Sequence, residues 1–337
     1  MSDSDLNLYP SITPFREGLL ELDHGHQMHW QLSGNADSQP VLWIHGGPGS
    51  RASPMHRRLF DPNKYLIIQY DQRGCGRSLP KGETRHNTTQ DLLADIERLR
   101  RFLGISAWHV AGGSWGGSLA LLYAQAHPEV IRRMLLRSPF LATEQEINAY
   151  LFTPPAGCQA VWEQLSRECN QDGPATILEY SHRVFGETGE GKQISAKQSR
   201  LARAWVSYES AMDSYPVTHS APTTQSTQFD DQALIARYRI HLHYLWHRCF
   251  LDKPIVDGLD RLKGLDLTLV HGDCDALCPF DNSLLIQKLV PQQLVPQQLV
   301  PPATLVTVPG AGHNAFDERM IRAVVQQIER WGALDGC

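Results

Sequence analysis

The stretch Ala111-Gly112-Gly113-Ser114-Trp115-Gly116-Gly117 decides the fold class of this 337-residue chain. It follows a strand-like run, Ala107 to Val110, and precedes a helix-like run, Ser118 to Ala126. A Gly-x-Ser-x-Gly sequence between a strand and a helix is typical of a nucleophile elbow, a strained turn that exposes the serine hydroxyl. The glycines two residues either side of the serine lie where neighbouring backbone leaves no room for a Cβ atom. A glycine-rich turn without catalytic meaning is the alternative until partners are found.

Partners for Ser114 follow later in the chain, each after a strand-like run. One run, 267–270, ends in a turn with two acids, Asp273 and Asp275, and a later run ends in a glycine-rich turn with His313. Serine, acid and histidine in this order form the α/β-hydrolase triad, and parallel sheets place their sites at the carboxyl ends of strands. The pattern predicts Ser114 as nucleophile, His313 as general base and acid, and an aspartate that orients the imidazole. Residues two apart on an extended segment share a face, so spacing alone does not decide which of the two aspartates is the triad acid.

A glycine-rich loop provides the second half of the expected oxyanion hole. The buried-strand-like run Pro40 to Ile44 leads into His45-Gly46-Gly47-Pro48-Gly49-Ser50. In this kind of site one N–H belongs to the residue after the nucleophile and another to an early loop. We therefore expect the N–H groups of Trp115 and Gly47 to bind the oxyanion, with Gly46 letting the substrate approach the backbone. A phosphate-binding loop does not fit, because the chain lacks Gly-Lys-Ser/Thr there and an acid suited to a ribose.

The composition predicts an ordinary globular protein. Apolar residues make up 42% and charged residues 20%, and the net charge is −5 without a basic stretch, which excludes nucleic acid as a partner. No apolar run is long enough to span a membrane, and the first residues lack the pattern of a secretory signal. Seven unpatterned cysteines fit reduced thiols, so we expect a cytoplasmic location.

Strand and helix patterns divide the chain into a core and an insert. Alternating strand-like and helix-like runs up to residue 139 predict a mostly parallel twisted sheet flanked by helices, with one antiparallel pair near its start, 18–23 with 27–33. From there to residue 253 clean strands are missing, and strand-like runs resume at Leu265. We therefore expect an α/β core of residues 1–139 and 254–337 and a helical cap of residues 140–253. Helical periodicity in the expected cap occurs at 160–168, 199–211 and 231–250.

A short tandem repeat, Leu-Val-Pro-Gln-Gln, begins at Leu289. Two units of this length are too few for a repeat architecture, so we expect a surface extension before the last strand.

With these motifs in view, the chain resembles the proline iminopeptidase (prolyl aminopeptidase) family of α/β-hydrolase-fold serine peptidases. The resemblance covers residues 15–140 and 255–332. Its markers are His45-Gly46-Gly47-Pro48-Gly49, Asp71-Gln72-Arg73-Gly74-Cys75-Gly76-Arg77-Ser78, Gly112-Gly113-Ser114-Trp115-Gly116 and Gly310-Ala311-Gly312-His313. The family's acid motif, which ends in Asp, two residues and Cys-Pro, matches Asp275-Ala276-Leu277-Cys278-Pro279, which favours Asp275 over Asp273.

The resemblance implies release of an N-terminal proline from a peptide, through an acyl-enzyme, without cofactor or metal. Cap glutamates of the family bind the imino cation, and Glu209 matches one of them. Phe140 lies where the family has a proline-packing aromatic residue. Tyr150 lies in the early cap segment, where the family has a run of aromatic residues and this chain has fewer of them. His241 stands where the family has a second glutamate, which removes one attraction for the amine.

Two other functions remain open from the sequence. The loss of a carboxylate at His241 also suits an esterase or amidase for small uncharged acyl groups, and a catalytically silent, ligand-binding hydrolase fold is the third hypothesis. The oligomeric state has no signal in the sequence. His243 and His247 lie four apart on an expected helix, but no Glu-x-x-His context or third ligand accompanies them, so packing or substrate contact is the expected role.

Overall fold

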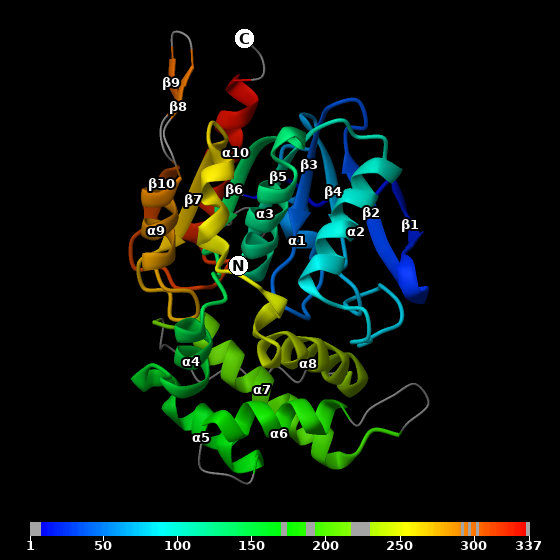
Figure 1. Cartoon of the computed structure of the whole chain (residues 1–337), viewed down its shortest axis with the longest axis vertical. Helices are drawn as coiled ribbons and strands as arrows, with labels where there is room; N and C mark the ends of the chain where they lie inside the picture. Colours follow the sequence, from blue (N-terminus) through cyan, green and yellow to red (C-terminus); the bar gives the residue numbers. More distant parts are fainter. Residues whose placement is uncertain are drawn as a thin grey trace.

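A central sheet of eight strands organises the molecule, here described by a computed structural model (Figure 1). The structure describes residues 8–169, 174–186, 193–216, 230–290, 293–295, 298–300 and 303–334. The strand order is β1-β2-β4-β3-β5-β6-β7-β10. The strands are β1 Arg16–Glu21, β2 Gln27–Gly34, β3 Gln39–Ile44, β4 Tyr65–Tyr70, β5 Trp108–Gly113, β6 Ile131–Arg137, β7 Asp266–Gly272 and β10 Thr304–Val308. The predicted antiparallel pair, β1 with β2, is present. β2 is antiparallel to β4 as well, and the strands from β4 to β10 run parallel to one another, as predicted for most of the sheet.

Side chains of the central strands alternate between two apolar layers, because successive residues of a strand point to opposite faces. On β3, Leu42 and Ile44 pack with the helices on one face, whereas Val41 and Trp43 pack with the C-terminal helix on the other. A parallel sheet buried on both faces is what continuous apolar strands produce. The helices of these layers are α1 Pro54–Arg57, α2 Thr89–Phe102, α3 Trp115–Ala126, α9 Asp281–Leu289 and α10 Glu318–Leu334.

Between β6 and β7 the chain leaves the sheet and forms a group of helices, which lie at one end of the molecule (Figure 1). We call residues 140–253 the helical insert. Its helices are α4 Glu144–Phe152, α5 Gln159–Glu168, α6 Pro174–Gly186, α7 Ala196–Ser214 and α8 Asp231–Trp246. They enclose an apolar cluster of their own, centred on Trp205, Tyr208 and Tyr238. Phe140 packs against both this cluster and that of the core.

The insert departs from the sequence prediction in two places. Helix α8 ends at Trp246 rather than running to residue 250, because residues 248–250 adopt positive φ angles, which a helix cannot contain. Helices α4 and α6 were not predicted. Helix α4 begins with a capping box of Thr143 and Glu146, a signal present in the sequence.

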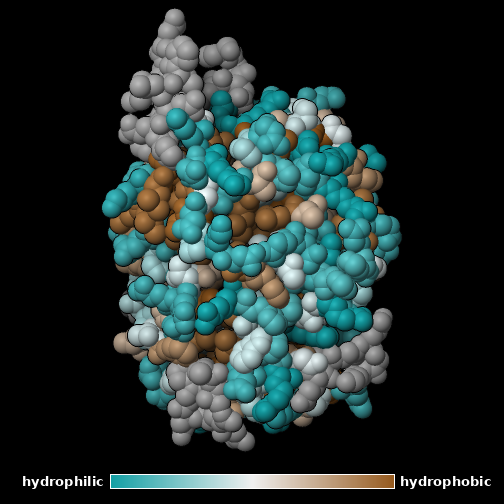
Figure 2. All heavy atoms as spheres, in the orientation of Figure 1, coloured by the Kyte–Doolittle hydropathy of each residue, from teal (hydrophilic) through white to brown (hydrophobic). Residues whose placement is uncertain are grey.

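The tandem repeat coincides with two short antiparallel strands, β8 Gln293–Val295 and β9 Gln298–Val300, which form a separate sheet beyond the end of the main one (Figure 1). The first two repeat residues, Leu289 and Val290, end α9, and residues 291–292, 296–297 and 301 lie outside the described ones. Nearby, apolar side chains gather over α9 (Figure 2), where Leu284, Leu285 and Leu289 are exposed. Among the helices of the described ranges, none is long and apolar enough to cross a membrane.

Candidate active site

Ser114 lies at a sharp turn between β5 and α3, with φ 55° and ψ −126°. A non-glycine residue in this region is strained and persists only where its surroundings enforce it. Its backbone N–H donates to the carbonyl of Arg137, which anchors the turn to the next strand. A Cβ atom on Gly116 would lie 2.2 Å from the carbonyl oxygen of Ile44, and one on Gly112 would lie 2.6 Å from that of Gly116. The expected crowding at both glycines is therefore confirmed.

His313 and Asp275 meet at the carboxyl ends of β10 and β7. The imidazole Nδ1 is 2.8 Å from Oδ2 of Asp275, and both side chains are buried. The other oxygen of Asp275 accepts hydrogen bonds from the N–H groups of Leu277 and Cys278, each at 2.9 Å. These bonds aim the carboxylate at the imidazole and leave Nε2 of His313 as the free nitrogen. Ser114 and His313 line one pocket.

Asp273, the rival acid, points elsewhere. Its carboxylate accepts a 2.6 Å hydrogen bond from the N–H of Gly310 at an exposed position. For Asp275, burial alone would raise the pKa, but His313 and a hydrogen bond from His271 outweigh burial and hold it far below its usual range. Asp275 is therefore an ionised, buried acid, which suits the stabilisation of an imidazolium.

The loop after β3 lies directly against the nucleophile. A Cβ atom on Gly46 would come within 3.4 Å of the Ser114 Cβ, and Gly47 adopts a φ of 124° that favours glycine. Trp115 is the first residue of α3, where backbone N–H groups have no acceptor within the helix. The expected oxyanion donors thus flank the same serine.

Gln72, from the Asp71–Ser78 motif, connects the loop after β3 with the turn that carries the nucleophile. Its amide nitrogen donates to the carbonyl of His45 at 2.8 Å, and its amide oxygen accepts from the indole of Trp115 at 3.1 Å. Its backbone N–H donates to the His45 imidazole at 3.0 Å. The motif therefore has a structural role, which is to fix the glycine-rich loop against the elbow.

A small, mainly apolar inner pocket opens beside Ser114. Its lining residues are Gly47, Pro48, Ser114, Phe140, Ile147, Tyr150, Glu209, His241, Leu245, Leu277 and Cys278. All the substrate-contact residues expected from the sequence except Gly46, which lines the adjoining pocket, therefore face one cavity. Burial keeps the pKa of the Cys278 thiol well above its usual value, and its sulfur lies 3.9 Å from the Ser114 hydroxyl as a neutral part of the wall.

Glu209 is held by four neighbours from the insert. Hydroxyl groups of Tyr150 and Tyr238 donate to it at 3.3 and 2.7 Å, and the Arg237 guanidinium lies 2.7 Å away. His241 is 3.7 Å from the same carboxylate. Burial would raise the pKa of Glu209, but Arg237 leads the groups that lower it, so the carboxylate stays ionised.

Burial lowers the pKa of His241, although Glu209 opposes this shift. The imidazole is therefore neutral, and Arg237 is the cation beside Glu209. A neutral imidazole at this position does not repel an amine bound in the pocket.

Three charged residues at the site were missed from the sequence. An outer pocket next to the inner one is lined by Ser114 and His313 together with Asp213, Arg237 and Arg137. Asp213 lies one helical turn after Glu209 on α7, so the two carboxylates share a helix face, and this spacing was a readable signal. Burial raises the pKa of Asp213, while His313 and Arg137 oppose part of the rise. Arg137 donates to the backbone carbonyl of His313 at 2.6 Å and so positions its loop.

Comparison with known proteins assigns the chain to a family. Residues 39–319 match the model of the alpha/beta hydrolase fold. A probable proline iminopeptidase of Leptolyngbya boryana is 33% identical over 335 residues, which cover 97% of each chain. The proline iminopeptidase of Xylella fastidiosa strain 9a5c is 34% identical over 94% of this chain and 97% of its own, and that of Arabidopsis thaliana is 34% identical over 98% and 83%. The chain belongs to the proline iminopeptidase family.

Solved structures agree on the fold of this proline iminopeptidase family member. A proline iminopeptidase-related protein of Thermus thermophilus aligns with a TM-score of 0.56 and 17% identity, covering 93% of this chain and 97% of its own. An alpha/beta fold hydrolase of Bacillus anthracis aligns with a TM-score of 0.59 and 18% identity, covering 94% and 100%. At such identities the likeness concerns the fold alone, which is the α/β-hydrolase fold predicted from the sequence.

Proposed function

We propose that this protein is a serine aminopeptidase that releases an N-terminal proline from short peptides. The observation that carries the proposal is the ionised carboxylate of Glu209 in the wall of an apolar pocket that also contains Ser114. A carboxylate at such a place recognises a cation, and the reacting group of the chain lies within the same cavity. The substrate class is that named for its relatives in bacteria and plants.

The reaction follows from the arrangement of Ser114, His313 and Asp275. Nε2 of His313 takes the proton of the Ser114 hydroxyl as Oγ attacks the carbonyl carbon of the N-terminal proline. The N–H groups of Gly47 and Trp115 hold the oxygen that becomes negative. His313 then gives its proton to the departing peptide amine, which leaves a prolyl ester on Ser114. Water, deprotonated by His313, hydrolyses this ester and releases proline.

The two pockets divide the substrate between them. The inner pocket, with Phe140 and Tyr150 in its wall, suits the pyrrolidine ring, and the outer pocket suits the departing peptide. We assign recognition of the imino cation to Glu209 and Asp213, which share a face of α7. Two carboxylates in a poorly hydrated site attract a cation more strongly than they would in water.

The helical insert acts as a cap in this proposal, and we divide the chain into a core of residues 1–139 and 254–337 and a cap of residues 140–253. Because α7 and α8 supply the charged side chains, the cap sets specificity while the core supplies the chemistry. We also propose a cytoplasmic location. Supporting this, the six cysteines of the described residues are all free, as in a reducing compartment.

The test is hydrolysis of proline β-naphthylamide beside N-acetyl-proline β-naphthylamide and p-nitrophenyl acetate, with Ser114→Ala as control. We expect strong preference for the unblocked proline, lost in Ser114→Ala. Equal cleavage of the blocked and unblocked amides would contradict recognition of the imino cation.

One observation favours a second candidate, an esterase or amidase for small uncharged acyl groups. Arg237 already neutralises much of the Glu209 charge through a 2.7 Å contact. In that case p-nitrophenyl acetate would be the better substrate, and its cleavage would still require Ser114. A protein in which a fluorophosphonate fails to label Ser114 would instead be a silent member of the fold.

A further inference from the structure

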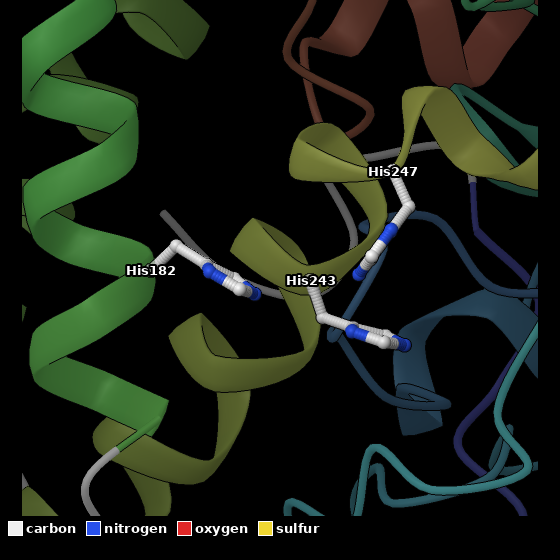
Figure 3. A group of neighbouring side chains, drawn as sticks. All are labelled: His182, His243 and His247. Atoms are coloured by element: carbon white, nitrogen blue, oxygen red, sulfur yellow. The ribbon is translucent and has the colours of Figure 1, made fainter.

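Three histidines gather on the insert, away from the proposed catalytic site. His243 lies in the last turn of α8, His247 is the residue that follows this helix, and His182 reaches toward them from α6 (Figure 3). Within the described part of the chain, this is the group of three potential ligands whose donor atoms all lie within 4.8 Å of one another. The sequence showed His243 and His247 without a third ligand, and the packing of α6 on α8 provides His182 as the third.

We propose that His182, His243 and His247 form a binding site for a divalent transition-metal ion, with Zn²⁺ as the preferred occupant. Three imidazoles and one water complete the tetrahedral sphere that zinc favours. A site with only nitrogen donors suits zinc, copper or nickel, and excludes magnesium and calcium, which require oxygen. The proposal is independent of the proposed peptidase activity.

Neighbouring groups hold the imidazoles in place. Nε2 of His243 lies 3.1 Å from the backbone carbonyl of Asn87, to which it donates, so that Nδ1 carries the free lone pair. Ligating histidines commonly make this second bond, because it fixes both tautomer and ring orientation. The ring of His182 stacks on Trp246 at 5.2 Å between centroids, and that of His247 stacks on Phe250 at 4.8 Å.

The geometry needs only side-chain adjustment to bind the ion. Zn–N bonds of about 2.0–2.1 Å place tetrahedral ligand nitrogens about 3.3–3.4 Å apart. The observed separations reach up to 4.8 Å, so the rings must move inward by about 1.5 Å, which small χ rotations allow for the exposed His247. Arg239 is the positive charge near His243, and its repulsion would weaken the site without blocking it.

A bound ion would tie α6 to the end of α8, the helix that also carries Arg237 and His241 of the pocket wall. Because the ion would bind the folded insert and not the unfolded chain, its effect on stability is measurable. The stabilised element would be the packing of two insert helices, at a distance from the nucleophile.

The test uses the full chain, freed of metal with EDTA, and titrated with ZnCl₂ by calorimetry and with CoCl₂ by visible absorption. We expect one Zn²⁺ per chain and the intense absorption of a low-coordinate Co²⁺ site. His182→Ala and His247→Ala should each weaken Zn²⁺ binding at least tenfold. His127→Ala, a partly exposed histidine of the core, is the matched control and should bind as the wild type does.

Thermal unfolding gives a second readout. At about 100 times its dissociation constant, Zn²⁺ should raise the Tm of the wild type by roughly 3–4 °C but leave that of His247→Ala unchanged. Since His247 is exposed, its substitution should not prevent folding, which the metal-free Tm will verify. Binding of equal strength in His182→Ala, His247→Ala and the wild type would overturn the proposal, as would no binding at all. If His182→Ala and His247→Ala still bound Zn²⁺ and the bound ion abolished hydrolysis, the ion would lie at His313 instead, which would also overturn the proposal.

Discussion

Replacing Glu209 with glutamine should remove selectivity for a free N-terminal imine while keeping the catalytic machinery. The substitution preserves the size of the side chain and an acceptor for the hydroxyls of Tyr150 and Tyr238. It removes the negative charge and leaves Arg237 unpaired in the pocket. Both changes act against a cationic substrate and neither acts on an uncharged one.

The magnitude follows from the charge interaction. Two unit charges about 4 Å apart interact by about 4 kcal/mol at an effective dielectric constant of about 20. At about 1.36 kcal/mol for each factor of ten, this corresponds to about 10³-fold in kcat/KM. Arg237 already offsets part of this attraction, and solvent screens another part, since the Glu209 side chain is 17% exposed. We therefore expect a loss of about 10²- to 10³-fold for proline β-naphthylamide.

The assay compares kcat/KM for proline β-naphthylamide and p-nitrophenyl acetate in Glu209→Gln. The ester should be cleaved within about threefold of the wild-type rate, because it carries no cation. Glu163→Gln, an exposed glutamate of α5, is the matched control and should change neither substrate. Equal losses for both substrates would show that Glu209 only maintains the fold of the pocket. Unchanged cleavage of the proline substrate would refute its role in recognition.

Three further outcomes are expected. Asp275→Asn should lower kcat by about 10⁴-fold while Asp273→Asn, two residues away, stays near the wild type, and the reverse order in steady-state kinetics would exchange their roles. Gly116→Ala should lower the free energy of unfolding by more than about 3 kcal/mol in urea titrations, since its Cβ would collide with a β3 carbonyl, and an unchanged midpoint would show that the turn relaxes. Arg237→Met should raise the pKa of Glu209. As the pH falls, the carboxylate of the variant should therefore become protonated at a higher pH than that of the wild type. The acid limb of kcat/KM for the proline substrate should therefore move upward, and a limb that stays in place would mean that Arg237 does not hold Glu209 ionised.

The catalytic core could be predicted from the sequence because each strand and turn that carries a catalytic residue is visible in a short stretch of sequence. Ser114 and His313 follow apolar strands, and parallel pairing brings the ends of such strands to one edge of the sheet. The choice of Asp275 over Asp273 was not local, because spacing allowed both. It came from the resemblance, and the 2.8 Å contact with His313 agrees with that choice.

The insert was harder to anticipate because its site depends on how helices pack. Arg237 faces the pocket only because α8 crosses α7 with a particular rotation, which periodicity does not give. The same holds for His182, whose neighbours His243 and His247, in and directly after α8, are about sixty residues away in the chain. The end of α8 was also misplaced, because positive φ angles at ordinary residues such as Cys249 have no residue-type signal.

The exchange of a glutamate for His241 relocates the charge of the pocket more than it removes it. The resemblance places a second carboxylate on α8, where this chain has an imidazole that burial keeps neutral. Asp213 restores a carboxylate from α7, one turn beyond Glu209 and on the wall of the outer pocket. Arg237 opposes the two acids, so the field on a bound imine is weaker than two unpaired carboxylates would produce. The same arginine holds Glu209 ionised and oriented before substrate arrives. A charge that is already fixed in place costs less reorganisation free energy on binding than a mobile one. In the proposed function, proline selectivity therefore depends on the geometry of α7 and α8 together, and not on the number of carboxylates alone.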